Sequence, residues 1–281
     1  MPTGGFLTAA EFNDLAGSGG LLRVRHYSNL SALLAGTVNR ERTIPRSLSG
    51  CNEGTPNLYS VSLTPDIDHS IIDVGFHFQR NCDLDRQARG RLTNFTAWTA
   101  AADIGADGRL TSAAAVKGRV VNGNIGDRDT AMFDNTRYTL YEVQYAKGDF
   151  GSWRLYLDNW QTGTAAYLPV TTHGGSTAFA NPTFATITSP AGKPAIVATV
   201  FVPSEGAAPG EAGQLAYYRE YLALAHLRQR PPHLSTGRWH ARAVPGDAVL
   251  RHRDRVGSWR RSVPGNGRSD GALRVWATLA L

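Results

Sequence analysis

Hydrophobic and polar residues alternate with period two in several short segments of the chain. The clearest segment alternates four apolar residues with polar or small ones, namely Ile72, Val74, Phe76 and Phe78. This pattern predicts a strand with one apolar and one solvated face. Similar signals predict strands at 59–63, 138–145, 153–157 and 195–202, separated by Gly, Asn, Asp and Pro. We therefore expect an all-β fold, an antiparallel β-barrel or sandwich.

Helical patterns are few. Residues 7–16 and 28–36 each predict a short helix, and a stripe at helical spacing predicts a third helix near the end of the body, formed by Leu215, Tyr218 and Leu222. The segment 103–110 starts like a calcium loop, but Ala114 stands where the closing acid is required. A tight Asp-Gly turn between strands is the preferred interpretation.

The positive charge is concentrated at one end. The formal net charge is +6, yet residues 1–226 contain 18 basic and 20 acidic residues, whereas residues 227–281 contain 11 arginines and three aspartates. We infer a folded body at 1–226 and an Arg-rich, flexible tail at 227–281. Arginines interleaved with Trp259 make RNA binding by the tail physically reasonable, although we do not otherwise expect nucleic-acid binding.

The cysteine content and the hydropathy of the chain argue against two classes of protein, disulfide-rich domains and membrane-inserted proteins. Cys51 and Cys82 are the only cysteines, too few for a disulfide framework, and we expect free thiols. No apolar run of about 18 residues occurs, and the N-terminus lacks the pattern of a signal peptide. Membrane insertion is not expected.

The sequence offers weak signals for chemistry. Its densest polar segment contains five side chains of metal-binding type, Asp66, Asp68, His69, Asp73 and His77. Only the last two share a strand face, and the others suit a turn, so no metal site is predicted. Ser176 lies near His173 without an orienting acid, which favours a flexible glycine loop. No phosphate or dinucleotide motif is present. We expect no cofactor, no catalytic residues and no enzymatic activity.

Three segments together resemble the surface spike of an astrovirus capsid protein, most closely an avian one. They are "GFLTAAEFNDLAGSGGLLRVRHYSN", "IPRSLSGCNEGTPNLYSVSL" and "IDVGFHFQRNCDLD", and "LTAAEF" is also similar to the start of the protruding domain of hepatitis E virus capsids. The resemblance implies a β-barrel homodimer on the virion surface, assembled in the host cytoplasm. It also implies binding to a host-cell receptor and to neutralising antibodies.

Two alternatives remain open. The segment "YTLYEVQYAKGDFGSWRLYLDN" is similar to laminin-G-type lectin sheets, which favours a carbohydrate-binding or polysaccharide-active β-jelly-roll protein. The segment 22–38 resembles the opening strand and helix of some ADP-ribosylating toxins, with His26 and Tyr27 near the nicotinamide cofactor. The toxin is the more remote alternative.

A receptor or glycan site would combine an aromatic platform with polar groups, because sugars stack on rings and hydrogen-bond through hydroxyls. Six residues near predicted turns fit this description: Trp98, Asp158, Asn159, Trp160, Gln161 and Tyr167. The alternative that these aromatic residues only fill the core remains open. Trp153 alternates with polar residues and is expected in the core.

Overall fold

The computed structural model describes residues 5–13, 19–63, 66–133, 135–220, 239–241 and 274–280. Most of these residues form antiparallel sheets. The first sheet has the order β17-β1-β2-β3, with β1 at Phe6–Asn13, β2 at Gly20–Tyr27, β3 at Arg40–Ile44 and β17 at Arg274–Ala280. The second sheet runs in chain order through β4 (Glu53–Leu63), β5 (Ser70–Arg80), β6 (Leu84–Thr93) and β7 (Ala97–Ala102).

Two further sheets follow along the chain. The third contains β8 (Ile125–Phe133), β9 (Thr136–Gln144), β10 (Trp153–Asn159) and β11 (Thr164–Tyr167). The fourth contains β13 (Ala180–Thr188), β14 (Pro194–Val202) and β15 (Gly213–Glu220). A short parallel pair joins β12 (Val170–Thr172) to β16 (Trp239–Ala241). The α-helices are α1 (Leu30–Ala35) and α2 (Ile104–Val116), and the short 3₁₀ turns are η1 (Ile67–His69), η2 (Phe150–Ser152) and η3 (Ser204–Gly206).

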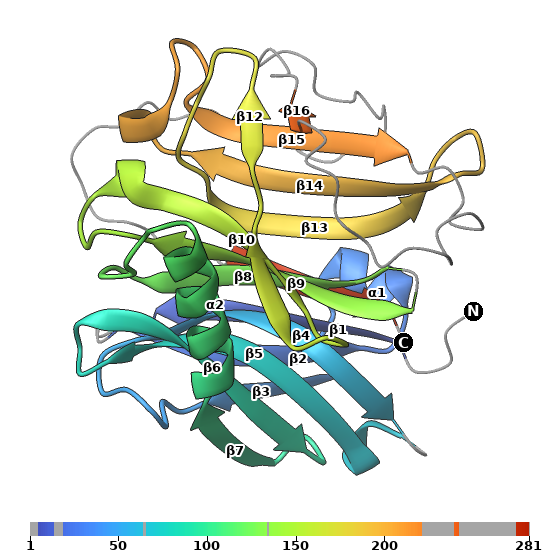
Figure 1. Ribbon diagram of the computed structural model, residues 1–281. Coiled ribbons are helices and arrows are strands. Elements are labelled where there is room, and N and C mark those ends of the chain that lie inside the picture. Colours follow the sequence, from blue (N-terminus) through green and yellow to red (C-terminus); the bar gives the residue numbers. More distant parts are fainter. Residues whose placement is uncertain are drawn as a thin grey trace, which may run out of the picture.

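The sheets stack face to face, and α2 lies along one side of the stack (Figure 1). Strand β4 contacts β1, β17 and β8, and β8 in turn contacts β13. The first strand of each sheet in chain order therefore contacts the first strand of the next sheet. The all-β class predicted from the sequence is confirmed, with sandwich-like packing repeated from sheet to sheet.

Apolar residues fill the space between sheets. The first and second sheets enclose a core that includes Leu22, Ile72, Val74 and Phe76. A second core lies between α2 and the third sheet, and a third core joins the third and fourth sheets. Trp153 is 7% exposed, as expected for a core residue.

A carboxylate on β8 ties three sheets together. Asp129 accepts a hydrogen bond from the Asn57 side chain of β4 at 2.6 Å and from the Phe184 backbone N–H of β13 at 3.0 Å. These contacts fix β8 between the second and fourth sheets. The face of the second sheet that looks toward β8 is thereby held against the third sheet.

Several local predictions are confirmed. The strands expected at 59–63, 72–79, 138–145, 153–157 and 195–202 lie within or largely within β4, β5, β9, β10 and β14. The helix expected at 28–36 is α1, where the Asn29 side chain accepts a hydrogen bond from the Ala32 N–H and Gly36 ends the helix in the left-handed conformation.

Three secondary-structure predictions are wrong. Residues 7–16 do not start a helix, because 6–13 pair with β2 and β17. The expected third helix is β15 as far as Glu220, and Leu222 lies outside the described residues. The Asp-Gly turn at 103–110 is the start of α2, in which Asp103 caps the Ala106 N–H. Strand pairing outweighed the local helical pattern in the first two cases, whereas in the third the local N-cap signal of Asp103 was missed.

One prediction about covalent structure also needs correction. Cys51 and Cys82 are not free but form a disulfide, with Cα atoms 5.5 Å apart. Within the predicted flexible tail, the described stretches 239–241 and 274–280 are strands that pair with β12 and β1. The rest of the tail, including Trp259, lies outside the described residues.

Candidate functional site

The face of β5 that the sequence predicted to be solvated is largely covered by the third sheet. Polar side chains of β5 and β6 that share this face form what we call the inter-sheet seam: Asp73, His77, Gln87, Arg89 and Arg91. The strand register brings Asp73 opposite Arg91 and His77 opposite Gln87. The seam has two parts, an open cleft and a buried network.

The open cleft has a volume of about 430 Å³. Its wall includes Tyr59, Asp73, Arg89, Arg91, Arg137 and Trp160. Gly75 makes room for the Tyr59 ring, because a Cβ atom there would lie 2.0 Å from Tyr59 Cζ. The glycine at position 75 of β5 therefore lets an aromatic ring enter an otherwise polar face.

The indole of Trp160 is held by contacts on several sides. Its ring centroid lies 5.1 Å from that of Tyr59 at an angle of 89°, an edge-to-face contact. The guanidinium carbons of Arg89 and Arg137 lie 4.3 Å and 4.9 Å from the centroid. The indole N–H donates to Thr139 Oγ1 at 2.9 Å. Trp160 is thus a fixed part of the cleft wall.

The charges in the cleft are partly paired. Arg91 donates to both oxygens of Asp73, at 2.7 Å and 3.2 Å, and the Ser60 hydroxyl donates to Asp73 at 2.7 Å. Burial opposes ionisation of Asp73, but these hydrogen bonds and the Arg91 charge lower its pKa below the ordinary value. Arg89 pairs with Asp103. The Asp73 carboxylate is therefore ionised and fixed at neutral pH.

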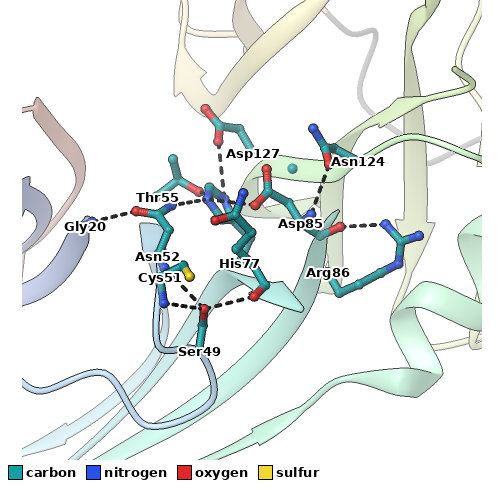
Figure 2. Close-up of polar contacts among 12 residues, drawn as sticks. Gly20, Ser49, Cys51, Asn52, Thr55, His77, Asp85, Arg86, Asn124 and Asp127 are labelled. Carbon is teal, nitrogen blue, oxygen red and sulfur yellow. Dashed lines mark hydrogen bonds and ion pairs between the residues drawn. The ribbon is translucent and has the colours of Figure 1, made fainter. Parts of the chain in front are cut away.

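The buried network centres on His77 of β5, which is 6% exposed. Its imidazole lies among side chains of β4, β6 and β8 (Figure 2). The Thr55 hydroxyl lies 2.6 Å from Nδ1, Asp127 Oδ1 lies 3.6 Å from Nδ1, and Asp85 Oδ1 lies 4.0 Å from Nε2. Asn52, next to the disulfide, lies 3.5 Å from Nε2. Among His77, Asp85 and Asp127, the side chain of Asp85 is the most exposed.

Burial shifts the protonation of this network. Loss of solvent, together with the Arg128 charge, lowers the pKa of His77 to about 3. Burial raises the pKa values of Asp85, Asp127 and Glu142, and the Asp127 charge raises that of Glu142 further. At neutral pH the imidazole is neutral and buried carboxyl groups retain protons more readily than exposed ones.

Backbone strain and buried polar atoms without hydrogen-bond partners occur in the same region. Thr55 has a φ of 45°, a conformation that β-branched residues rarely adopt. Among the described residues, the Arg128 Nε and Gln87 Oε1 atoms are buried without a hydrogen-bond partner. Such features concentrate at functional sites because the surrounding structure must compensate for their cost.

The structure brings one of the six predicted site residues into the cleft, Trp160. The Trp98 ring packs on Phe76, on the opposite face of the second sheet. Asp158 is fully buried and pairs with Arg109 at 2.6 Å. The other three residues lie in separate contacts: Asn159 accepts backbone N–H groups of its own turn, Gln161 accepts from Thr136, and Tyr167 packs on Tyr156.

Sequence reasoning missed Tyr59 as a cleft residue, together with Arg89, Arg91 and Arg137. The parity of Arg89 and Arg91 along their strand places them on one face, and this signal was available. The sequence did not supply the register that places Asp73 opposite Arg91, or the sheet that covers them.

The other chemical candidates are dispersed. Asp66 accepts from His69 Nδ1 at 2.8 Å, and Asp68 pairs with Arg40. Within the described ranges, no three His, Cys, Asp or Glu side chains are placed to hold a metal ion. The glycine loop predicted to be flexible is held by Glu211, which accepts from the Ser176 hydroxyl at 2.5 Å.

The toxin-like pair lies in the first sheet, and His26 contacts the Asn39 side chain at 2.9 Å. Both His26 and Tyr27 are buried, each 6% exposed. In the part of the chain that the structure describes, no helix is long and apolar enough to cross a membrane.

No protein-family model and no curated protein matches this chain. Among solved structures, the chain is similar to a leech intramolecular trans-sialidase complexed with 2,7-anhydro-Neu5Ac, with 13% identity over 71% of this chain and 26% of that one, and a TM-score of 0.33. It is also similar to a Penicillium chrysogenum α-L-arabinanase complexed with arabinobiose, with 13% identity, coverage of 70% and 59%, and a TM-score of 0.33.

A third similar structure is a Bombyx mori GH32 β-fructofuranosidase, with 11% identity, coverage of 77% of this chain and 46% of that one, and a TM-score of 0.34. The chain thus spans less than two thirds of each of these proteins. All three are enzymes, which contradicts our expectation of a protein without enzymatic activity, and that expectation is withdrawn. At these TM-scores the likeness identifies neither a reaction nor a site.

Proposed function

We propose that this protein binds carbohydrate in the cleft beside Trp160. One observation carries the proposal, the composition of the cleft wall. Indole and phenol rings lie next to guanidinium, carboxylate and hydroxyl groups around an open volume of about 430 Å³. Ligand sites typically have volumes of about 300–1,000 Å³ and combine apolar walls with a few placed polar groups.

The polar groups of the cleft suit sugar hydroxyls. Asp73 is ionised and held by Arg91 and Ser60, so it offers a preorganised acceptor for hydroxyl hydrogens. Arg137 and Arg91 offer donors in planar geometry. The edges of Tyr59 and Trp160 supply apolar surface for the C–H face of a sugar ring. Because these side chains are fixed by one another, binding orders few of them.

The Cys51–Cys82 disulfide favours a redox compartment that is compatible with carbohydrate binding. Structural disulfides form and persist in oxidising compartments and are rare in the cytosol. We therefore propose that the protein works in an oxidising environment, where extracellular carbohydrate is accessible. Assembly in the host cytoplasm, which the resemblance to a capsid spike implies, stays a prediction.

Binding is tested on the purified protein with an array of oligosaccharides, followed by titration calorimetry of those that bind. Trp160→Ala should weaken binding by about tenfold or more, because it removes ring surface and releases two guanidiniums. The matched control is Trp98→Ala, the same substitution on the opposite face of the second sheet. Equal affinities of the wild type and both folded variants would contradict a site at Trp160.

Cleavage of the bound carbohydrate is a second candidate function, favoured by the buried network. Glycosidases need a carboxylic acid that is protonated near neutral pH to protonate the leaving oxygen. Asp85 and Asp127 have raised pKa values, and the side chain of Asp85 is 23% exposed to solvent.

Cleavage is tested by incubating the protein with oligosaccharides that bind and measuring new reducing ends. Asp85→Asn should abolish product while binding in the cleft persists, whereas Asp83→Asn, at an exposed turn, should leave the rate unchanged. Product formation that survives Asp85→Asn would remove Asp85 from the reaction.

The predicted capsid spike, its virion-surface location, its host receptor, its homodimer and its recognition by neutralising antibodies stay predictions. Their test is direct: the purified protein should be dimeric, should bind susceptible host cells and should compete with infection. Carbohydrate binding without any cell binding would favour the lectin-like alternative.

A further inference from the structure

The cleft contains more positive than negative groups. Its wall carries three guanidiniums, those of Arg89, Arg91 and Arg137, but one carboxylate, that of Asp73. Arg91 is committed to Asp73 at 2.7 Å, and Arg89 is committed to Asp103. The third guanidinium, that of Arg137, makes no salt bridge to a carboxylate among the described residues.

The position of Arg137 is fixed although its charge is unpaired. Its carbonyl oxygen accepts the Trp160 backbone N–H at 3.0 Å, and its guanidinium lies 4.9 Å from the Trp160 ring centroid. Stacking on an aromatic ring uses the plane of a guanidinium and leaves its N–H edges available. Arg137 also contributes to the low pKa of Asp73, so its charge acts inside the cleft.

An unpaired guanidinium with free N–H edges matches a carboxylate, because two parallel N–H···O bonds can form in one plane. Excess positive charge in a concave site also concentrates anions near it. A neutral sugar would use the ring surface and Asp73 but would leave Arg137 without an anionic partner.

We propose that the cleft selects carbohydrates that carry a carboxylate group, and that the Arg137 guanidinium is the group that recognises it. The inference rests on the carbohydrate binding proposed above. It adds the substrate class and names the residue that sets specificity.

The test compares three oligosaccharides of equal length and linkage: a neutral one, one with uronic acid units, and one sulfated at the same position. Affinities are measured by calorimetry at low and at high ionic strength, with single-stranded RNA as a further ligand. Arg137→Gln removes the charge and keeps a hydrogen-bonding side chain. Arg119→Gln is the matched control, because Arg119 also lies against an aromatic ring, 5.7 Å from the Tyr145 centroid, and is not part of the cleft wall.

The uronate ligand should bind at least about tenfold more tightly than the neutral one at low ionic strength. Arg137→Gln should remove this preference, because it should weaken uronate binding by at least about tenfold more than neutral binding, and Arg119→Gln should retain the preference. Equal binding of neutral and uronate ligands would overturn the inference and leave the proposed function intact. Preference for sulfate alone, preference for RNA, or equal losses in both variants would also overturn it. If no oligosaccharide binds, the proposed function itself fails.

Discussion

The ring of Tyr59 lies in the space that a side chain at position 75 would occupy, with Cζ 2.0 Å from the position of a Cβ atom on Gly75. Tyr59 belongs to β4 and Gly75 to the neighbouring β5. Because Gly75 leaves this space open, the Tyr59 ring lies against Trp160, with the two ring centroids 5.1 Å apart. One missing side chain thereby shapes the wall of the cleft.

Gly75→Ala should therefore displace the Tyr59 ring. We expect a loss of about 1–3 kcal/mol in the free energy of unfolding, since overpacked sites force neighbours out of their preferred rotamers. Denaturant titration measures the loss. The control is Gly108→Ala in α2, where a Cβ atom meets nothing within 4 Å and stability should rise by about 0.4–1 kcal/mol. Equal effects of the two substitutions would contradict this account of the cleft wall.

The disulfide should contribute measurably to stability. Cys51 and Cys82 are 31 residues apart in sequence, and closing such a loop restricts the unfolded chain. The double variant Cys51→Ser, Cys82→Ser should lose about 2–4 kcal/mol in denaturant titration. Reducing agent should destabilise the wild type by a similar amount and leave the variant unchanged. Two titratable thiols in the denatured, unreduced wild type would show that the bond is absent.

Glu211 should make the protein sensitive to acid. Its carboxylate accepts hydrogen bonds from Ser176, Thr172 and the Gly174 N–H, which lower its pKa to about 2 although burial opposes this. A carboxyl with a lowered folded-state pKa stabilises the protein above its unfolded pKa, and this contribution is lost as the pH falls toward 2.

Glu211→Gln should accordingly reduce the melting temperature at neutral pH and flatten its decline between about pH 5 and pH 2. Glu205→Gln, at an exposed position in η3, serves as the control and should keep the wild-type profile. An identical acid profile in wild type and Glu211→Gln would exclude this role.

Glu142 should have the opposite pH dependence. It is buried and accepts the Asp127 N–H at 3.0 Å, and its pKa is raised by burial and by the Asp127 charge. A carboxyl with a raised folded-state pKa contributes stability at low pH that is lost as the pH rises through its folded pKa. Glu142→Gln should therefore reduce the loss of stability from mildly acidic to alkaline pH, as measured by thermal unfolding. A wild type equally stable across that range would contradict the prediction.

The strand pattern of this protein was readable from the sequence because the side-chain period of a strand is a local property. Ile72, Val74 and Phe76 had to share a face whatever sheet they joined. The same holds for α1, whose cap residues Asn29 and Gly36 are local signals. The all-β class followed from such segments without knowledge of their partners.

Tertiary structure decided what each face meets. The face of β5 that carries Asp73 and His77 reads as solvated, and only the third sheet makes it a buried seam with a cleft. Residues 6–13 became a strand because Arg274–Ala280, from the far end of the chain, pairs with them. The pairing of Cys51 with Cys82 likewise depends on which turns lie side by side.

The candidate site shows the same division. Trp160 was recognisable from residue type and from its polar neighbours, because aromatic chemistry is carried by a single side chain. Its partners Tyr59, Arg89 and Arg137 come from three strands of two sheets, and contacts between strands distant in sequence leave no local signal. The sequence by itself determined the strands and one aromatic residue of the cleft. The packing of the second sheet against the third determined the rest, since a site built between sheets exists only once both are in register.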